Sequence, residues 1–115
     1  NRRSRGLGDV YKRQDWMISL MNRVIDQSTA VRVHSHVEKF DGTKSPPGFE
    51  AVVLLDESHL TAHCYSANGW LSIDCFTCGT ADTVAIIDAM DEAIRKASPT
   101  IKLEKRHSET RFING

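Results

Sequence analysis

The chain has 115 residues, 40% of them hydrophobic, and 15 basic residues balance 15 acidic ones. This length predicts one domain with a modest core, so we expect further surface to be buried against a second copy. No apolar run approaches the roughly 20 residues of a membrane span, and the charged N-terminus is unlike a signal peptide. The sequence therefore favours a cytoplasmic protein with no membrane partner.

Residues 1–14 carry five basic side chains and one acidic side chain. A basic arm can bind nucleic acid or an anionic surface. However, this segment has no helical or strand period, and Val10–Gln14 resembles translated sequencing-adapter sequence. We interpret residues 1–14 as a non-native or disordered arm, place the domain in residues 15–115, and expect no nucleic-acid partner.

From Asp15 the pattern becomes regular. Apolar residues at three-and-four spacing predict a helix over residues 15–28, with Asp15 as its cap. Its expected buried stripe is Trp16, Met17, Leu20, Met21, Val24 and Ser28. Residues 30–40 then alternate in the two-residue period of a half-buried strand, with Val31, Val33 and Val37 on one side.

A loop rich in Gly, Pro and Ser covers residues 41–48. Strands are predicted over 50–55, 59–65 and 70–77, the last two flanking the hairpin sequence Ser66–Gly69. Thr80 or Asp82 can cap a second helix that ends at Ala97 before Ser98 and Pro99. Alternation over residues 100–105 predicts a final short strand. The pattern is that of an α+β fold with helices on one face of an antiparallel sheet.

Parity along the hairpin assigns its two faces, whether the connecting loop has two or four residues. One face is an ordinary core face: Leu60, Ala62, Cys64, Leu71, Ile73 and Cys75. The other is too polar for a core and too aromatic for plain solvent: His59, Thr61, His63, Tyr65, Trp70, Ser72, Asp74, Phe76 and Cys78. We expect a site or a partner sheet on this second face.

The second face places His63 and Cys78 on one side, and Ser58 lies where the chain enters the strand. A hydroxyl, an imidazole and a thiol that can converge suggest nucleophilic or proton-transfer chemistry. Exposed histidines and a packed cysteine are common alternatives. A metal site that adds His34 and His36 has no supporting ligand spacing, so we expect no metal.

Two segments together resemble a known family. Glu57-Ser58-His59-Leu60-Thr61-Ala62-His63, followed by Gly69 and then by Asp74-Cys75-Phe76-Thr77-Cys78-Gly79, is similar to the signature of the prokaryotic S-adenosylmethionine decarboxylase proenzymes. The likeness runs from about Asp15 to Arg111. It implies a pyruvoyl-dependent decarboxylase of the spermidine pathway.

The resemblance implies that the Ser58 hydroxyl attacks the Glu57 carbonyl, that His63 takes a proton during β-elimination, and that the chain splits between these two residues. Residue 58 becomes a pyruvoyl group, which captures the substrate amine and accepts the electrons released by loss of CO₂. Cys78 would then protonate the α-carbon. The family fold further implies a homodimer in which the second sheet face meets its partner.

The chain also departs from the family. Members begin with a strand that has no counterpart here, and the glutamate expected to bind the ribose is Ala67. A serine usual eight residues before the cleavage serine is Glu50. Tyr65 can still stack on an adenine ring, while Glu50 and Asp74 can face a cationic side chain. Three functions stay open: S-adenosylmethionine decarboxylation, decarboxylation of ornithine or arginine, and an uncleaved binding or regulatory subunit.

Overall fold

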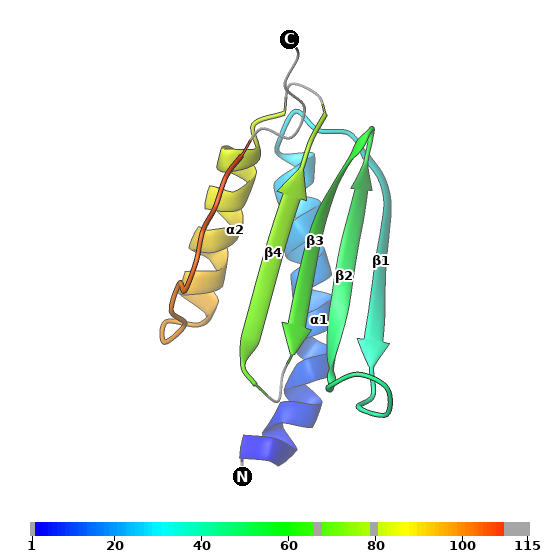
Figure 1. Cartoon of the computed structure of the whole chain (residues 1–115), viewed down its shortest axis with the longest axis vertical. Helices are drawn as coiled ribbons and strands as arrows, with labels where there is room; N and C mark the ends of the chain where they lie inside the picture. Colours follow the sequence, from blue (N-terminus) through cyan, green and yellow to red (C-terminus); the bar gives the residue numbers. More distant parts are fainter. Residues whose placement is uncertain (1, 66–67, 79–80, 110–115) are drawn as a thin grey trace.

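The computed structural model describes residues 2–65, 68–78 and 81–109, with side chains from residue 13 onward. In chain order the elements are α1 (Arg2–Asp26), β1 (Arg32–Phe40), β2 (Gly48–Leu55), β3 (Ser58–Tyr65), β4 (Trp70–Phe76) and α2 (Thr83–Ala97). Figure 1 shows the strands side by side in chain order, α1 behind them and α2 beside β4. The α+β class with an antiparallel sheet is confirmed.

The four strands form a meander with the order β1-β2-β3-β4, and every neighbouring pair is antiparallel. The pairing of Tyr65 with Trp70 fixes a four-residue loop between β3 and β4. The register also pairs Leu60 with Cys75 and His59 with Phe76, so the predicted division of the hairpin into two faces is confirmed. Ser66 and Ala67, in the predicted turn, lie outside the described residues.

The core lies between the sheet and the two helices. Its buried side chains come from α1, β2, β3 and α2, while the helix-facing residues of β4 are half-buried. They are Met17, Leu20, Met21, Val24, Ile25, Phe49, Ala51, Val53, Leu55, Leu60, Ala62, Cys64, Ile86, Met90 and Ile94. Both helices therefore cover the same sheet face, as predicted, and the opposite face stays open.

The first helix differs from its prediction at its N-terminal end. Helix α1 begins at Arg2, so Asp15 lies inside it and does not cap it. Arg, Lys, Leu and Gln are good helix formers, which lets the amphipathic part extend toward the N-terminus. Trp16 lies at the rim of the stripe and is 39% exposed, whereas Met17 and Met21 are buried as expected. The assignment of residues 1–14 as foreign sequence stays a prediction.

Strand β1 is less buried than its alternation suggests. Its register shifts between Arg32 and His34, which is a bulge, and Val31 and Val33 are both exposed. Of the three valines placed on one side of this strand by the sequence, Val37 packs against the core. A bulge inserts one extra residue into the strand. The alternation of side chains between the two sheet faces is therefore not kept between Val37 and the residues at or before the bulge.

The second helix was predicted closely. Asp82 is the N-cap, and its side chain accepts a hydrogen bond from the Ala85 N–H. Thr80, the other candidate cap, lies outside the described residues. Ile86, Met90 and Ile94 form the buried stripe, whereas Ala97, also expected in it, is exposed.

The predicted strand at 100–105 is wrong. Residues 101–109 have no regular structure and run beside α2, where Arg106 forms a 2.7 Å ion pair with Asp88 (Figure 1). Strand alternation yields a strand only if the backbone finds a sheet edge with which to pair, and this segment instead is held to the helix by its charges.

Candidate active site

A two-residue turn holds the bond at which cleavage is predicted. Asp56 and Glu57 connect β2 to β3 between the paired residues Leu55 and Ser58. Glu57 has φ 63, and among the described residues it is the one non-glycine residue with a positive φ. The Asp56 N–H donates to the Val31 carbonyl at 2.9 Å. The Glu57–Ser58 bond therefore lies in a turn that is anchored on both sides and is conformationally unfavourable.

Ser58 and Cys78 are brought together, as the sequence predicted. The Cys78 N–H donates to Ser58 Oγ at 3.0 Å, across 20 residues of chain. The pairing of His59 with Phe76 causes this approach, because it brings the first residue of β3 next to the chain leaving β4. Cys78 itself is exposed. A hydroxyl and an accessible thiol thus share one end of the hairpin.

His63 lies elsewhere on the sheet. It is five residues along β3 from Ser58, or roughly 16 Å at the rise of an extended strand. Its Nε2 lies 3.3 Å from Glu50 Oε1, the carboxylate directly across on β2. The three-residue convergence predicted from the sequence is therefore met for Ser58 and Cys78 but not for His63 within one chain.

Asp74 is paired with a residue that the sequence reasoning left without a role. Asp74 Oδ2 lies 3.0 Å from His59 Nε2, and the His59 ring also contacts the ring of Phe76. His59 and Asp74 are diagonal neighbours on the open face, which the parity assignment could have revealed. Both acidic residues predicted to face a cationic substrate, Glu50 and Asp74, therefore already have an imidazole partner.

Aromatic side chains gather at the far end of the open face. Tyr65 stacks on Phe40, with ring centroids 6.4 Å apart, across the strand that carries Gly48. Trp70 is the neighbour of Tyr65 on β4 and is 65% exposed. A planar ligand or a second protein surface is the natural partner of such a group. Ala67, the predicted substitution for a ribose-binding glutamate, lies outside the described residues.

The other two cysteines point toward the helices. Burial raises the pKa of the Cys64 thiol, and burial followed by the charge of Asp74 raises the pKa of Cys75 to about 11. Both thiols are therefore protonated at neutral pH, and a protonated thiol is a poor nucleophile. Cys78, exposed beside Ser58, is the cysteine suited to chemistry.

No cluster of three potential ligands suited to a metal ion occurs in the described part of the chain. His34 and His36 are exposed on β1, and His36 lies 3.6 Å from Glu38. No helix in that part is long and apolar enough to cross a membrane.

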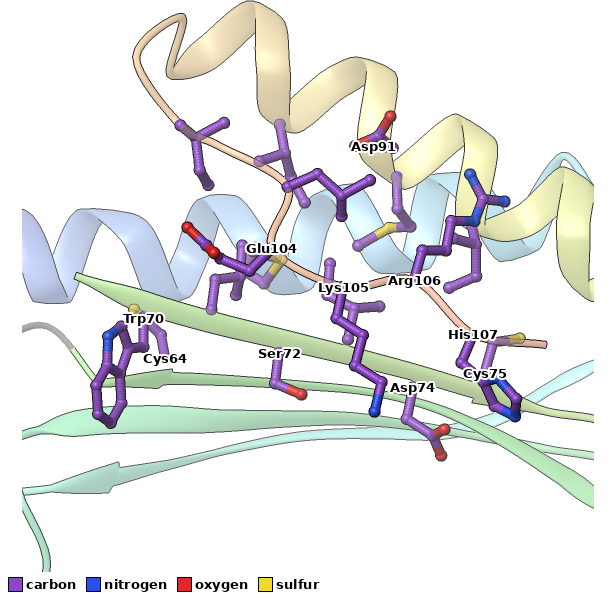
Figure 2. A pocket seen from close by; sticks show the side chains of 18 of the residues that line it. Cys64, Trp70, Ser72, Asp74, Cys75, Asp91, Glu104, Lys105, Arg106 and His107 are labelled. Carbon is purple, nitrogen blue, oxygen red and sulfur yellow. The ribbon is translucent and has the colours of Figure 1, made fainter. Parts of the chain in front are cut away.

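A groove separates β4 from α2 and from residues 100–109. Figure 2 shows Ser72, Asp74 and Cys75 on the strand facing Lys105 and His107 on the C-terminal segment. The groove reaches Cys78 but is not lined by Ser58 or His63. It is therefore a consequence of the unpaired C-terminal segment rather than the site that the motif defines.

Together these features describe an α+β protein in which Ser58 and Cys78 meet at one end of a hairpin. The family model described as "S-adenosylmethionine decarboxylase" matches residues 8–107 of the chain. The chain therefore belongs to the S-adenosylmethionine decarboxylase family.

Similar proteins carry the name "S-adenosylmethionine decarboxylase proenzyme". The one from Anoxybacillus flavithermus is 39% identical over 62 residues, which are 53% of this chain and 50% of that protein. The one from Hydrogenobaculum is 30% identical over 92 residues, covering 80% and 64%. The one from Archaeoglobus fulgidus is 28% identical over 91 residues, covering 79% and 76%. The chain thus spans about half the length of the first of these relatives.

Proposed function

We propose that the chain is a proenzyme that cleaves itself between Glu57 and Ser58 and then decarboxylates S-adenosylmethionine to supply spermidine synthesis. The observation that carries the proposal is the hydrogen bond from the Cys78 N–H to Ser58 Oγ at the end of a strained turn. It joins the two halves of the family motif in space. The names of the relatives support the substrate over ornithine or arginine.

The cleavage step needs groups that this end of the hairpin supplies. Ser58 Oγ adds to the Glu57 carbonyl carbon, the C–N bond breaks, and the hydroxyl proton ends on the freed nitrogen of residue 58, leaving an ester. A base, for which we propose His63, then takes the Ser58 α-proton and the Cβ–Oγ bond breaks, so the Glu57 carboxylate departs with Oγ as one of its oxygens. The Cys78 N–H, already on Oγ, stabilises the negative charge that develops there.

Elimination leaves a dehydroalanine at position 58, and hydrolysis of its imine tautomer releases ammonia and gives the pyruvoyl group. This group supplies a carbonyl that binds the substrate amine and accepts electrons when CO₂ leaves. The residues fit it, because the first residue of β3 is held by the backbone N–H of Cys78, whose own side chain is exposed. To Cys78 we assign the role of proton donor to the substrate α-carbon.

Substrate recognition falls to the open face. Tyr65, which stacks on Phe40, offers an aromatic surface for the adenine ring. Because Tyr65 lies seven residues along β3 from residue 58, or roughly 23 Å, the Tyr65 that meets this ring has to come from a second copy. Glu50 and Asp74 offer carboxylates for the positively charged part of the substrate, each in exchange with its imidazole partner. S-adenosylmethionine carries a sulfonium cation, so both chemistries suit one ligand.

The open face also supports assembly as a homodimer. Large apolar side chains such as Trp70 and Leu54 are 65% and 44% exposed there, among polar neighbours. His63 is too far from Ser58 to act on it in the same chain, so its predicted role in processing requires a second copy. An α/β/β/α sandwich formed by two such faces answers both needs.

Mixing two inactive variants tests the shared site. Neither Ser58→Ala nor His63→Ala alone should cleave, but after co-refolding the His63→Ala chains should split at residue 58, with His63 supplied by the other copy. Ser58→Ala chains remain whole throughout and serve as the internal control. Cleavage by His63→Ala alone removes His63 from processing, and an uncleaved mixture removes the shared site.

The substrate is tested by CO₂ release from carboxyl-labelled S-adenosylmethionine, with labelled ornithine and arginine as controls. We expect release from S-adenosylmethionine and loss of release in Cys78→Ala, whose chains should still cleave. Release from ornithine or arginine alone contradicts the proposed substrate.

A further inference from the structure

The residue whose carbonyl is attacked is also the residue whose backbone is strained. Glu57 has φ 63, in the left-handed region that disfavours side chains with a Cβ. Tight turns place glycine or asparagine at such a position, and a glutamate gains nothing there from its own conformational preference. Glu57 is exposed, so packing of its side chain does not account for it either.

The turn cannot relax by itself because its surroundings hold it on three sides. Leu55 and Ser58 are paired in the sheet, and the Asp56 N–H is bound to the Val31 carbonyl. On the far side, Ser58 Oγ is held by the Cys78 N–H. Rotation of Glu57 to an ordinary φ would break at least one of these contacts.

The Val31 anchor is in turn fixed by a two-point ion pair. Arg32 donates from Nε to Asp26 Oδ1 at 3.0 Å and from its terminal nitrogen to Asp26 Oδ2 at 2.9 Å. An acidic residue at the C-terminal end of a helix is unfavourable to the helix dipole, so this pairing compensates for a residue that α1 alone would disfavour. The start of β1 is thereby tied to the end of α1, next to the cleavage turn.

We infer that the left-handed backbone conformation of Glu57 promotes self-cleavage. Its conformational strain is present in the uncleaved chain and is released during the reaction. The inference rests on the proposed function. When Ser58 Oγ adds to the Glu57 carbonyl carbon, that carbon becomes tetrahedral and the C–N bond loses its planarity, so the turn is no longer held by a rigid peptide. Once the C–N bond breaks, φ of Glu57 is free. The strain therefore raises the energy of the starting chain more than that of the transition state.

Substitutions at position 57 separate the backbone from the side chain. Glu57→Gly and Glu57→Asn accept a positive φ readily, whereas Glu57→Gln keeps the ordinary backbone preference and removes only the charge. Glu57→Gln is thus the matched control. Each variant is made in the parent chain, for the cleavage rate, and in Ser58→Ala, for the stability of the whole chain.

The cleavage rate is followed by mass spectrometry on freshly synthesised, pulse-labelled chains. Glu57→Gln should cleave within about twofold of the parent, and Glu57→Gly about fivefold more slowly, the factor that corresponds to about 1 kcal/mol of left-handed strain. Glu57→Asn should lie between the two.

Thermal unfolding in the Ser58→Ala background should move the opposite way. Glu57→Asn should unfold roughly 2 to 4 °C above Glu57→Gln, because the strain is relieved in the folded chain. If Glu57 only maintained the shape of the turn, substituting it would lower the cleavage rate and the melting temperature together. Equal cleavage rates for all variants, equal slowing of all three, or a loss of stability in Glu57→Asn overturns the inference. A parent chain that never cleaves refutes the proposed function itself.

Discussion

Gly48 is the residue at which one added methyl group should do most damage to the site. It begins β2 and pairs with Tyr65 on β3. A Cβ at this position would lie 1.9 Å from the Cys64 carbonyl oxygen and 3.1 Å from the Tyr65 Cα. Both are backbone atoms, so the clash cannot be relieved by rotating a side chain, and β2 and β3 must separate.

The cost of Gly48→Ala follows from that separation. One or two backbone hydrogen bonds at about 1 kcal/mol each, with the repacking of the neighbouring buried Phe49, give about 2–4 kcal/mol of lost unfolding free energy. For a chain of this size the melting temperature should fall by roughly 8–16 °C. The stack of Tyr65 on Phe40 should loosen as well.

The assay is thermal unfolding followed by circular dichroism in the Ser58→Ala background, where the chain stays whole. Gly69→Ala is the matched control, because a Cβ there meets nothing within 4 Å and the strain comes only from φ +67. It should cost about 1 kcal/mol, or roughly 4 °C. A Gly48→Ala melting temperature at or above that of Gly69→Ala refutes the steric reasoning.

Three further predictions follow from the placement of the cysteines and of the open face. At pH 8 iodoacetamide should modify Cys78 well before Cys75, because the pKa of about 11 leaves roughly 0.1% of Cys75 as thiolate. Unfolding in urea should abolish the difference in labelling rate, and equal labelling of the two cysteines in the folded chain contradicts the prediction. The pKa of Cys75 is raised in the folded chain, so the stability that its protonated thiol contributes should be complete below pH 9 and be lost as pH rises to about 11. The melting temperature of the parent should therefore fall over that interval, and it should fall less steeply in Cys75→Ala. An equal slope in the two proteins contradicts this prediction. Trp70→Ala should weaken self-association by at least about 100-fold in sedimentation, since the two copies together lose about 3–6 kcal/mol of apolar burial. Trp16→Ala, exposed on the other side of the sheet, should leave self-association unchanged, and equal effects of the two substitutions argue against the open face as the interface.

The hairpin was the part most predictable from the sequence. Side chains on a strand alternate strictly, so a loop of two or of four residues gives the same two faces, and either register brings the start of β3 close to the chain that leaves β4. That is why the meeting of Ser58 and Cys78 could be expected. The pattern says nothing about distance along a strand, which is why His63 was grouped with them although it pairs with Glu50.

Other features depend on tertiary contacts that local patterns do not contain. The bulge that exposes Val33 follows from the fit of β1 to β2 and to the end of α1, and the extension of α1 to Arg2 reflects propagation of an existing helix. Residues 100–105 alternate like a strand, but Arg106 is held by Asp88 on α2. The positive φ of Glu57 has no sequence signal, because its residue type argues against it.

The mass of the purified protein tests the central claim most directly. Cleavage between Glu57 and Ser58 with conversion of residue 58 predicts two fragments, residues 1–57 and 58–115, the second lighter than its sequence mass by one ammonia, and an intact Ser58→Ala chain. A single species at the mass of the whole parent chain contradicts the claim.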